Sequence, residues 1–268
     1  MSRLDKQQLN ISVLLEDAIR ISRLTGALLK DRLLTDFSID HKGEVDLVTE
    51  MDRAAQDLIR KEILLKYPDH GILAEEDLDI PGSSGFRWIV DPLDGTTNYA
   101  HRFPTFCVSI AVACDNDVIC GVVYNPVSEE LFKAIKNDGA SLNDTPISVS
   151  DTGQLNDSLL GTGFPTNIRE TAYTNFNHFS EFAVRTHGIR RCGSTALDLC
   201  FVACGRLDGY WALTPMPWDI AAGVLIVREA GGAATDFKGN QLGIDGSRVL
   251  ASNGHIHEQM MEILKLSI

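Results

Sequence analysis

The spacing of apolar residues changes twice along this chain, and the order of the changes restricts the fold to a layered α/β class. The first 34 residues place small and apolar side chains at helical intervals, at Leu14, Ala18, Ile21, Thr25 and Leu28. A second helix is predicted over 51–66. Short apolar runs typical of strands follow at 72–74, 88–90, 106–113, 121–124 and 131–135, so the middle of the chain is expected to form a sheet.

The second change comes after about residue 157, where strand and helix patterns alternate. Strands are predicted near Leu159, Ile189 and Tyr210, and helices over 169–186, 194–204 and 217–230. Glycines at 205 and 231 stand where helices are expected to end. Because no low-complexity linker separates the two portions, we predict two closely packed subdomains, an N-terminal α+β one over 1–150 and a C-terminal α/β one over 151–268.

Charge and hydropathy exclude several classes of partner. The 268 residues include 24 basic and 37 acidic side chains, for a formal net charge of −13, so a nucleic acid is not expected as the main partner. No apolar stretch approaches the roughly 20 residues of a membrane-spanning helix, and the charged N-terminus lacks a secretory signal. We therefore expect a cytoplasmic protein, whose six cysteines, without a C-x-x-C pair, are buried free thiols.

The segment WIVDPLDGTTN, at 88–98, is the strongest local feature. An apolar strand runs into two acids, Asp91 and Asp94, separated by Pro92 and Leu93. Proline has a fixed φ and no N–H, so the chain is expected to leave the strand sharply. The two carboxylates can then converge on one point while the Leu93 carbonyl stays available.

Gly95 and Thr96 follow these acids and would offer backbone N–H groups to an anion. A solvated turn is the plain alternative, because Asp-Pro and Asp-Gly pairs are common in loops. By itself the segment does not decide between the two interpretations.

Further acids stand where apolar runs or helices begin or end, at Asp46, Glu75, Glu76 and Asp219. Each has an ordinary explanation. Glu75 could be a surface acid, Thr49 with Asp52 fits a helix capping box, and Asp219 suits the positive end of a helix dipole. Taken together, they place carboxylates at strand ends and a helix start, where ligand sites in layered α/β proteins tend to lie.

A cluster of carboxylates needs cations to offset its repulsion. With no histidine or cysteine beside these acids, the oxygen ligands favour a hard ion such as Mg²⁺ over zinc. A magnesium site facing N–H donors suits the hydrolysis of phosphate esters, in which metal ions activate water.

The longer segments that contain these residues resemble the inositol monophosphatase family of Mg²⁺-dependent, lithium-sensitive phosphatases, and most closely its bacterial branch. The resemblance runs through VDLVTEMD at 45–52, ILAEED at 72–77, the segment from Trp88 to Val112, GTGFP at 161–165, CGSTALDLCFVACG at 192–205 and PWDIAAGVLIVREAGG at 217–232. It implies a five-layered αβαβα sandwich, hydrolysis of inositol 1-phosphate or a similar polyol or sugar phosphate by metal-activated water, and a homodimer.

The same resemblance implies a role for each site residue. Glu75, Asp91 and the Leu93 carbonyl would hold a first Mg²⁺, and Asp91, Asp94 and Asp219 a second, with a third near Glu75 in some relatives. Thr96, paired with Asp46, would help to activate the attacking water, with Glu75 also in the catalytic set. The substrate contacts would come from Asp94, Gly95, Thr96, Gly193, Ser194, Thr195 and Asp219.

The alcohol part of the substrate is open, because Ala212 stands where the family usually has a glutamate that binds ring hydroxyls. A hydroxyl at Thr195, where alanine is common, points to another polyol or sugar phosphate, although water or a neighbouring side chain could replace the lost contact. Rival substrates within the fold are fructose 1,6-bisphosphate, histidinol phosphate and NADP. A regulatory role in binding RNA or the transcription machinery is the rival from another class. The pair His255 and His257 is more typical of a polar loop than of a metal site.

Overall fold

The computed structural model describes residues 3–35, 39–41, 47–76, 78–165, 168–171, 174–244 and 248–266. Two helices form the first layer, α1 (Arg3–Arg32) and α2 (Glu50–Lys66). A two-stranded antiparallel ribbon, β1 (Ile39–His41) and β2 (Leu47–Thr49), leads into α2. The predicted pair of N-terminal helices is confirmed, with the second starting at the expected capping box between Thr49 and Asp52.

An eight-stranded sheet forms the second layer, in the order β10-β9-β8-β7-β6-β5-β3-β4. Its strands are β3 (Gly71–Ala74), β4 (Leu78–Ile80), β5 (Phe86–Asp94), β6 (Cys107–Cys114), β7 (Asp117–Asn125), β8 (Glu130–Ile135), β9 (Gly139–Leu142) and β10 (Thr145–Pro146). Among the described strands of this sheet, only β3 and β5 pair in parallel. A short helix, α3 (Thr96–Ala100), follows β5, and positive φ values at Asn137 and Gly139 turn the chain between β8 and β9.

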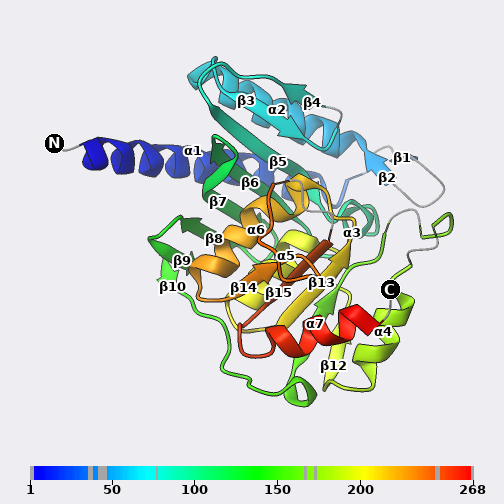
Figure 1. Ribbon diagram of the computed structural model, residues 1–268. Helices are drawn as coiled ribbons and strands as arrows, with labels where there is room; N and C mark the ends of the chain where they lie inside the picture. The colour runs from blue at the N-terminus through cyan, green and yellow to red at the C-terminus, as the bar shows by residue number, and fades with distance from the viewer. Residues whose placement is uncertain are drawn as a thin grey trace.

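Two helices, α5 (Thr195–Ala203) and α6 (Pro217–Glu229), lie between this sheet and a five-stranded one. The smaller sheet has the order β12-β11-β13-β15-β14, from β11 (Leu159–Thr162), β12 (Gly188–Arg190), β13 (Gly209–Leu213), β14 (Ala233–Thr235) and β15 (Arg248–Ser252). A 3₁₀ turn, η1 (Leu155–Asp157), precedes it, and α4 (Phe176–Ala183) and α7 (His257–Leu266) cover its outer face. Figure 1 shows the succession, with α2 at the top, α5 and α6 between the sheets, and α4 and α7 at the bottom.

Three apolar cores fill the spaces between these five layers. The first joins α1 and α2 to the large sheet and includes Trp88. The second surrounds α5 and α6 and touches both sheets. The third lies between the small sheet and α4 and α7, and includes Trp211. The αβαβα sandwich is therefore confirmed, and within the described residues no helix is long and apolar enough to cross a membrane.

One predicted helix is much shorter than expected. The sequence predicts a helix over 169–186, whereas α4 spans Phe176–Ala183. Asn175 has a φ of 67° and points its side-chain amide into the core, where it donates to Thr162 Oγ1 (2.9 Å) and the Gly163 carbonyl (2.7 Å). A left-handed residue cannot continue an α-helix, so the helix begins after it. The predicted helix ends at Gly205 and Gly231 are confirmed by φ values of 73° and 87°.

Candidate active site

Asp91 and Asp94 lie at the end of β5, on either side of a β-bulge. In the register with β6, Asp91 is opposite Ser109 and Asp94 is opposite Cys107, so three steps along β5 match two along β6. Side chains alternate across a regular strand, and residues three apart would point to opposite faces. The extra residue, at Pro92–Leu93, restores both carboxylates to one face. Proline thus interrupts a central strand and allows the convergence expected from the sequence.

Glu75 is brought beside Asp91 by the parallel pairing of β3 with β5. Ala74, the last residue of β3, is opposite Val90, so the next residues along each strand are Glu75 and Asp91. Asp91 is 2% exposed, and its Oδ1 accepts a hydrogen bond from the Leu93 N–H (3.0 Å). Burial, then the negative charges of Glu75, Asp94 and Asp219, raise the pKa of Asp91 well above its usual range.

Asp94 closes the N-terminus of α5, a helix from the other half of the chain. Its Oδ2 accepts hydrogen bonds from Ser194 Oγ (2.7 Å) and from the Ala196 N–H (2.7 Å). Ser194 is the N-cap residue of α5, and its Oγ accepts from the Leu197 N–H (3.3 Å). The positive end of the helix dipole therefore faces a buried carboxylate. Burial raises the pKa of Asp94, and these hydrogen bonds oppose the rise.

Asp219 reaches the same cluster from the first turn of α6. Its Oδ2 accepts from the Met216 N–H (2.8 Å), as expected of an acid at a helix start. A Cβ built on Gly121 of β7 would lie 3.0 Å from Ala222 Cα, so α6 packs directly on the large sheet. Burial, then the charges of Asp94 and Glu75, raise the pKa of Asp219 well above its usual range. The four acids are therefore within electrostatic reach of one another.

The chemistry of these donors suits a hard cation. The hydrogen bonds named above engage one carboxylate oxygen each of Asp91, Asp94 and Asp219. Buried carboxylates that raise one another's pKa are stabilised by positive charge, and oxygen ligands suit Mg²⁺. Among the described residues, however, no group of three or more His, Cys, Asp or Glu side chains is placed so that it could hold a metal ion.

Thr96 has a partner that the sequence analysis missed. Its Oγ1 lies 2.8 Å from Asp52 Oδ1 and 3.1 Å from the Leu93 carbonyl. Asp52 is 2% exposed, and its Oδ2 accepts from the Thr49 N–H (2.7 Å) and Thr49 Oγ1 (2.6 Å). One carboxylate thus caps α2 and also holds Thr96. Asp46 lies outside the described residues, so its expected pairing with Thr96 stays a prediction.

The capping box explains why Asp52 was missed. The T-x-x-D spacing at 49–52 accounts fully for an acid at this position, so nothing in the sequence required a second role. The signal that could have found it is geometric. It is the contact of Asp52 Oδ1 with Thr96, which follows β5 and lies 44 residues away in sequence.

The backbone turns at Gly95 and Gly193 both need glycine. Gly95 has a φ of 101° and a built Cβ would lie 2.9 Å from the Thr105 carbonyl oxygen. Gly193 has a φ of 84°, and its Cβ would lie 2.8 Å from Asn98 Nδ2. Side chains are excluded at both positions by conformation and by space. Both turns adjoin the carboxylates. Gly95 and Thr96 follow Asp94 directly in sequence, and the segment from Gly193 to Thr195 approaches from the other half of the chain.

A hydroxyl pair lies on the side where the alcohol of a substrate is expected. Thr195 Oγ1 is 3.0 Å from the hydroxyl of Tyr210, which is fully buried in β13. A Cβ built on Gly163 would lie 2.9 Å from that hydroxyl and 3.6 Å from Ala212 Cβ. Ala212 is itself 4% exposed. This side therefore presents small or hydroxyl-bearing groups, with Thr195 half-buried.

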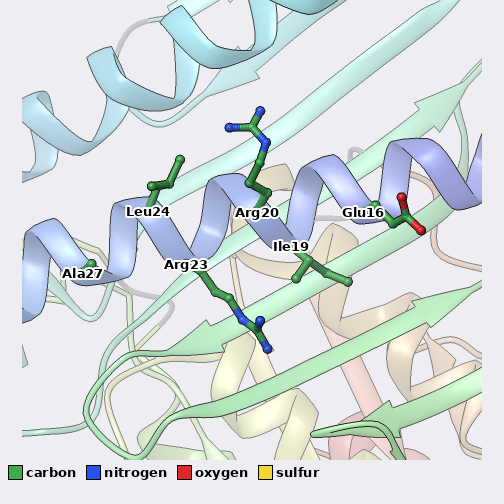
Figure 2. A pocket seen from close by; sticks show the side chains of 6 residues that line it. All are labelled: Glu16, Ile19, Arg20, Arg23, Leu24 and Ala27. Carbon is green, nitrogen blue, oxygen red and sulfur yellow. The ribbon is translucent and has the colours of Figure 1, made fainter.

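Two other features are set apart from the site. A cavity of about 370 Å³ on α1 is lined by Glu16, Ile19, Arg20, Arg23, Leu24 and Ala27, none of them a predicted site residue (Figure 2). His257 has both ring nitrogens within hydrogen-bond distance of hydroxyls, Ser252 Oγ (2.8 Å) and Thr235 Oγ1 (2.9 Å). The interpretation of the pair His255 and His257 as a polar loop stays a prediction.

The chain is similar to known proteins in sequence and in fold. The family model described as the inositol monophosphatase family matches residues 10–268. An inositol-1-monophosphatase from Synechocystis sp. is 47% identical over 228 residues, 84% of this chain and 79% of that protein. The Nus factor SuhB from Escherichia coli is 38% identical over 251 residues, 92% and 94% of the two chains. The structure of an inositol monophosphatase from Anabaena (Nostoc) sp. superposes with a TM-score of 0.88 at 40% identity, over 97% and 98% of the chains.

Proposed function

Because the chain belongs to the inositol monophosphatase family and is a phosphoric monoester hydrolase, we propose that it hydrolyses inositol 1-phosphate or a similar polyol or sugar phosphate with the help of Mg²⁺. The observation that carries this proposal is the placement of Thr96, hydrogen-bonded to Asp52, beside a group of acids in which the charges of Glu75 and Asp94 raise the pKa of Asp91 and Asp219. A proton acceptor and an anionic cluster then lie in one site, at the meeting point of β5, α5 and α6.

The hydroxyl of Thr96 lies on the path by which the attacking water would lose its proton. As an attacking water gives a proton to Thr96 Oγ1, the hydroxyl proton of Thr96 passes along its hydrogen bond to Asp52 Oδ1, so the proton ends on the carboxylate. Asp52 is held in place by two further hydrogen bonds from Thr49. Water activation by this pair needs no covalent phosphoenzyme, because neither group attacks phosphorus.

Two Mg²⁺ ions would be held by Glu75, Asp91, the Leu93 carbonyl, Asp94 and Asp219. A third ion would bind near Glu75. When bound, Mg²⁺ supplies positive charge that lowers the pKa of a coordinated water and offsets charge on the phosphoryl oxygens. The N–H groups of Gly95 and Thr96 would bind the phosphate on one side. Gly193, Ser194 and Thr195 would bind the substrate on the other, with Asp94 and Asp219 between them.

The substrate alcohol is proposed to be a polyol or sugar other than, or in addition to, inositol. The Ala212 side chain offers no acceptor to a ring hydroxyl, and the hydroxyl pair of Thr195 and Tyr210 is the polar group proposed to face the alcohol instead. A buried hydrogen bond contributes about 0.5–1.5 kcal/mol, so its absence weakens selectivity without abolishing binding. Fructose 1,6-bisphosphate, histidinol phosphate and NADP are the alternatives within this class.

A phosphate-release screen tests the proposal. Purified protein is incubated with inositol 1-phosphate, sugar phosphates, histidinol phosphate and NADP, at Mg²⁺ concentrations from zero to millimolar and with EDTA as a control. We expect Mg²⁺-dependent phosphate release from at least one polyol or sugar phosphate, and partial inhibition by Li⁺. No release from any substrate, or release that EDTA leaves unchanged, would contradict the proposal. The Ala212→Glu variant is expected to raise selectivity for inositol 1-phosphate.

A second candidate function is regulatory. The similarity to the protein named Nus factor SuhB supports a role in binding RNA or the transcription machinery. Asp94→Asn separates the two functions, because it removes a charge from the carboxylate cluster and leaves the surface unchanged. If loss of the protein causes a cellular phenotype and the Asp94→Asn variant still rescues it, the result would favour binding over hydrolysis.

We also propose a homodimer in the cytoplasm, which gel filtration and cell fractionation would test.

A further inference from the structure

One side-chain amide joins the two backbone segments that flank the carboxylates. Asn98, in α3, donates from Nδ2 to the Thr105 carbonyl (2.6 Å) and to the Cys192 carbonyl (2.8 Å). The two amide protons therefore have one acceptor each. Thr105 belongs to the N-terminal half of the chain and Cys192 to the C-terminal half, 94 residues from Asn98 in sequence.

Both segments are packed against this bridge without spare room. The Thr105 oxygen lies 2.9 Å from a Cβ built on Gly95. Asn98 Nδ2 lies 2.8 Å, and Oδ1 3.0 Å, from a Cβ built on Gly193. Gly95 therefore packs against the Thr105 carbonyl that Asn98 binds, and Gly193 packs against the Asn98 amide itself.

We propose that Asn98 is a positioning residue that fixes the separation between the segments 95–96 and 193–196, and so sets the affinity of the site for the phosphoryl group. This inference rests on the proposed phosphatase function. The Cys192 carbonyl immediately precedes Gly193 and the α5 cap, from which Ser194 Oγ and the Ala196 N–H reach Asp94. A shift of Cys192 would therefore move these donors relative to Asp94 and relative to Gly95.

A purely structural role would have different consequences. Loss of two hydrogen bonds anywhere in the protein lowers thermal stability, whereas a positioning role also alters binding by the folded molecule. Because Asn98 holds the Thr105 carbonyl, which packs against Gly95, whose N–H would bind the phosphate, its loss should weaken every phosphate monoester, whatever the alcohol. It should also weaken inorganic phosphate, which has no alcohol.

The test compares Asn98→Ala and Asn98→Asp with Asn253→Ala. Asn253 is 2% exposed and also donates from Nδ2 to two oxygens, Ser150 Oγ (3.1 Å) and the Thr152 carbonyl (2.8 Å). Asn253 also lies away from Ala212 along the small sheet. It follows Ser252, which pairs with Gly209 at the start of β13, whereas Ala212 is near the end of that strand. All variants are measured for melting temperature, for KM and kcat with two different phosphate monoesters, and for the Kd of inorganic phosphate with Mg²⁺ by calorimetry.

We expect Asn98→Ala to raise KM for both substrates, and the Kd of phosphate, by about three- to tenfold, the range of one or two net hydrogen bonds. Asn98→Asp should be worse, since a carboxylate oxygen would face two carbonyl oxygens. Asn253→Ala should lower the melting temperature and leave KM and Kd within about twofold. If Asn98→Ala does not fold, Asn98→Ser, which is too short to join both carbonyls, is measured in its place.

A double-mutant cycle with Gly193→Ala gives a second readout. The added methyl group meets the Asn98 amide in the wild-type background and loses that contact in the Asn98→Ala background, while the strain of an alanine at a φ of 84° is common to both. The fold-increase in phosphate Kd caused by Gly193→Ala should therefore be smaller in Asn98→Ala protein. Unchanged KM and Kd in folded Asn98 variants of an active enzyme would overturn the inference. An inactive wild-type protein would instead overturn the proposed function.

Discussion

Single residues in this protein can have two roles, one in their own element and one toward a distant part of the chain. Asp52 supports the start of α2 with Oδ2 and Thr96 with Oδ1. Asp94 belongs to the large sheet and accepts hydrogen bonds from the N-terminus of α5. Sequence patterns recognised the local duty of each acid, as a cap or a turn residue. The second duty depends on contacts 44 to 102 residues away along the chain, which spacing alone cannot supply.

Substitutions at Thr96 test the proton path. Thr96→Ala removes the hydroxyl that lies between Asp52 and the attacking water, and general-base catalysis of this kind contributes about 10²- to 10⁴-fold. We expect kcat to fall by at least about 10²-fold, with the melting temperature within a few degrees of the wild type. Thr96→Ser keeps the hydroxyl and should retain most activity. Equal losses in both variants would show that the methyl group, and not the hydroxyl, matters.

The buried carboxyl of Asp198 is expected to make the stability of the folded protein depend on pH. It is 1% exposed in α5, its Oδ1 has no hydrogen-bond partner, and burial raises its pKa to about 8. The folded state therefore binds this proton more tightly than the unfolded chain, so stability falls as pH rises from about 4 toward 8. Asp198→Asn removes this contribution. Its melting temperature should match the wild type near pH 4 and exceed it increasingly up to pH 8, as scanning calorimetry would measure. A constant difference would contradict the assignment.

At the scale of elements, α6 sets the distance between Asp219 and the strand-borne acids. The helix fits against β7 because Gly121 leaves room for Ala222. The apolar residues over 217–230 predicted the helix, and buried strand runs predicted the sheet. Which helix covers which strand could not be read from them, since any apolar stripe can pack on any apolar face. The bulge in β5 was anticipated in its effect, because Pro92 cannot donate to a ladder.

Gly121→Ala tests this packing. The new methyl group would lie 3.2 Å from Ala222 Cβ and 3.0 Å from its Cα, so α6 must move away from the sheet. Overpacking of this kind costs about 1–3 kcal/mol. We expect that loss in the free energy of unfolding by urea, together with a raised Mg²⁺ requirement for phosphate release. Gly153→Ala is the control, because a Cβ there meets nothing within 4 Å. Equal stability of the two variants would contradict the close fit.

At the scale of the whole molecule, the central core makes the two sheets depend on each other. Residues of α5 and α6 contact strands of both sheets, so neither sheet can be exposed without opening this core. The sequence predicts two subdomains with a shared interface, divided at 150, and that boundary stays a prediction. The layer order followed from the family resemblance. The sharing of one core by both halves required the structure.

Tryptophan fluorescence can measure this dependence. Trp88 lies in the core under α1 and α2, and Trp211 in the core under α4 and α7. Variants that keep only one of them, with the other and Trp218 replaced by phenylalanine, report on opposite outer layers. We expect each signal to change at the same urea concentration as the backbone circular dichroism of the same variant. A fluorescence midpoint that differs from the circular dichroism midpoint by more than about 1 M would show that the layers unfold separately.

The double role of Asp52 also affects how sequences of this kind are interpreted when catalysis has been lost during evolution. A descendant that kept the fold as a binding protein would still need an acid at this position to begin α2, so selection for folding alone would retain it. Thr96 has no comparable duty in capping a helix of this length. Among descendants, a retained aspartate at 52 is therefore poor evidence of a working phosphatase, whereas a lost hydroxyl at 96 is good evidence of its decay.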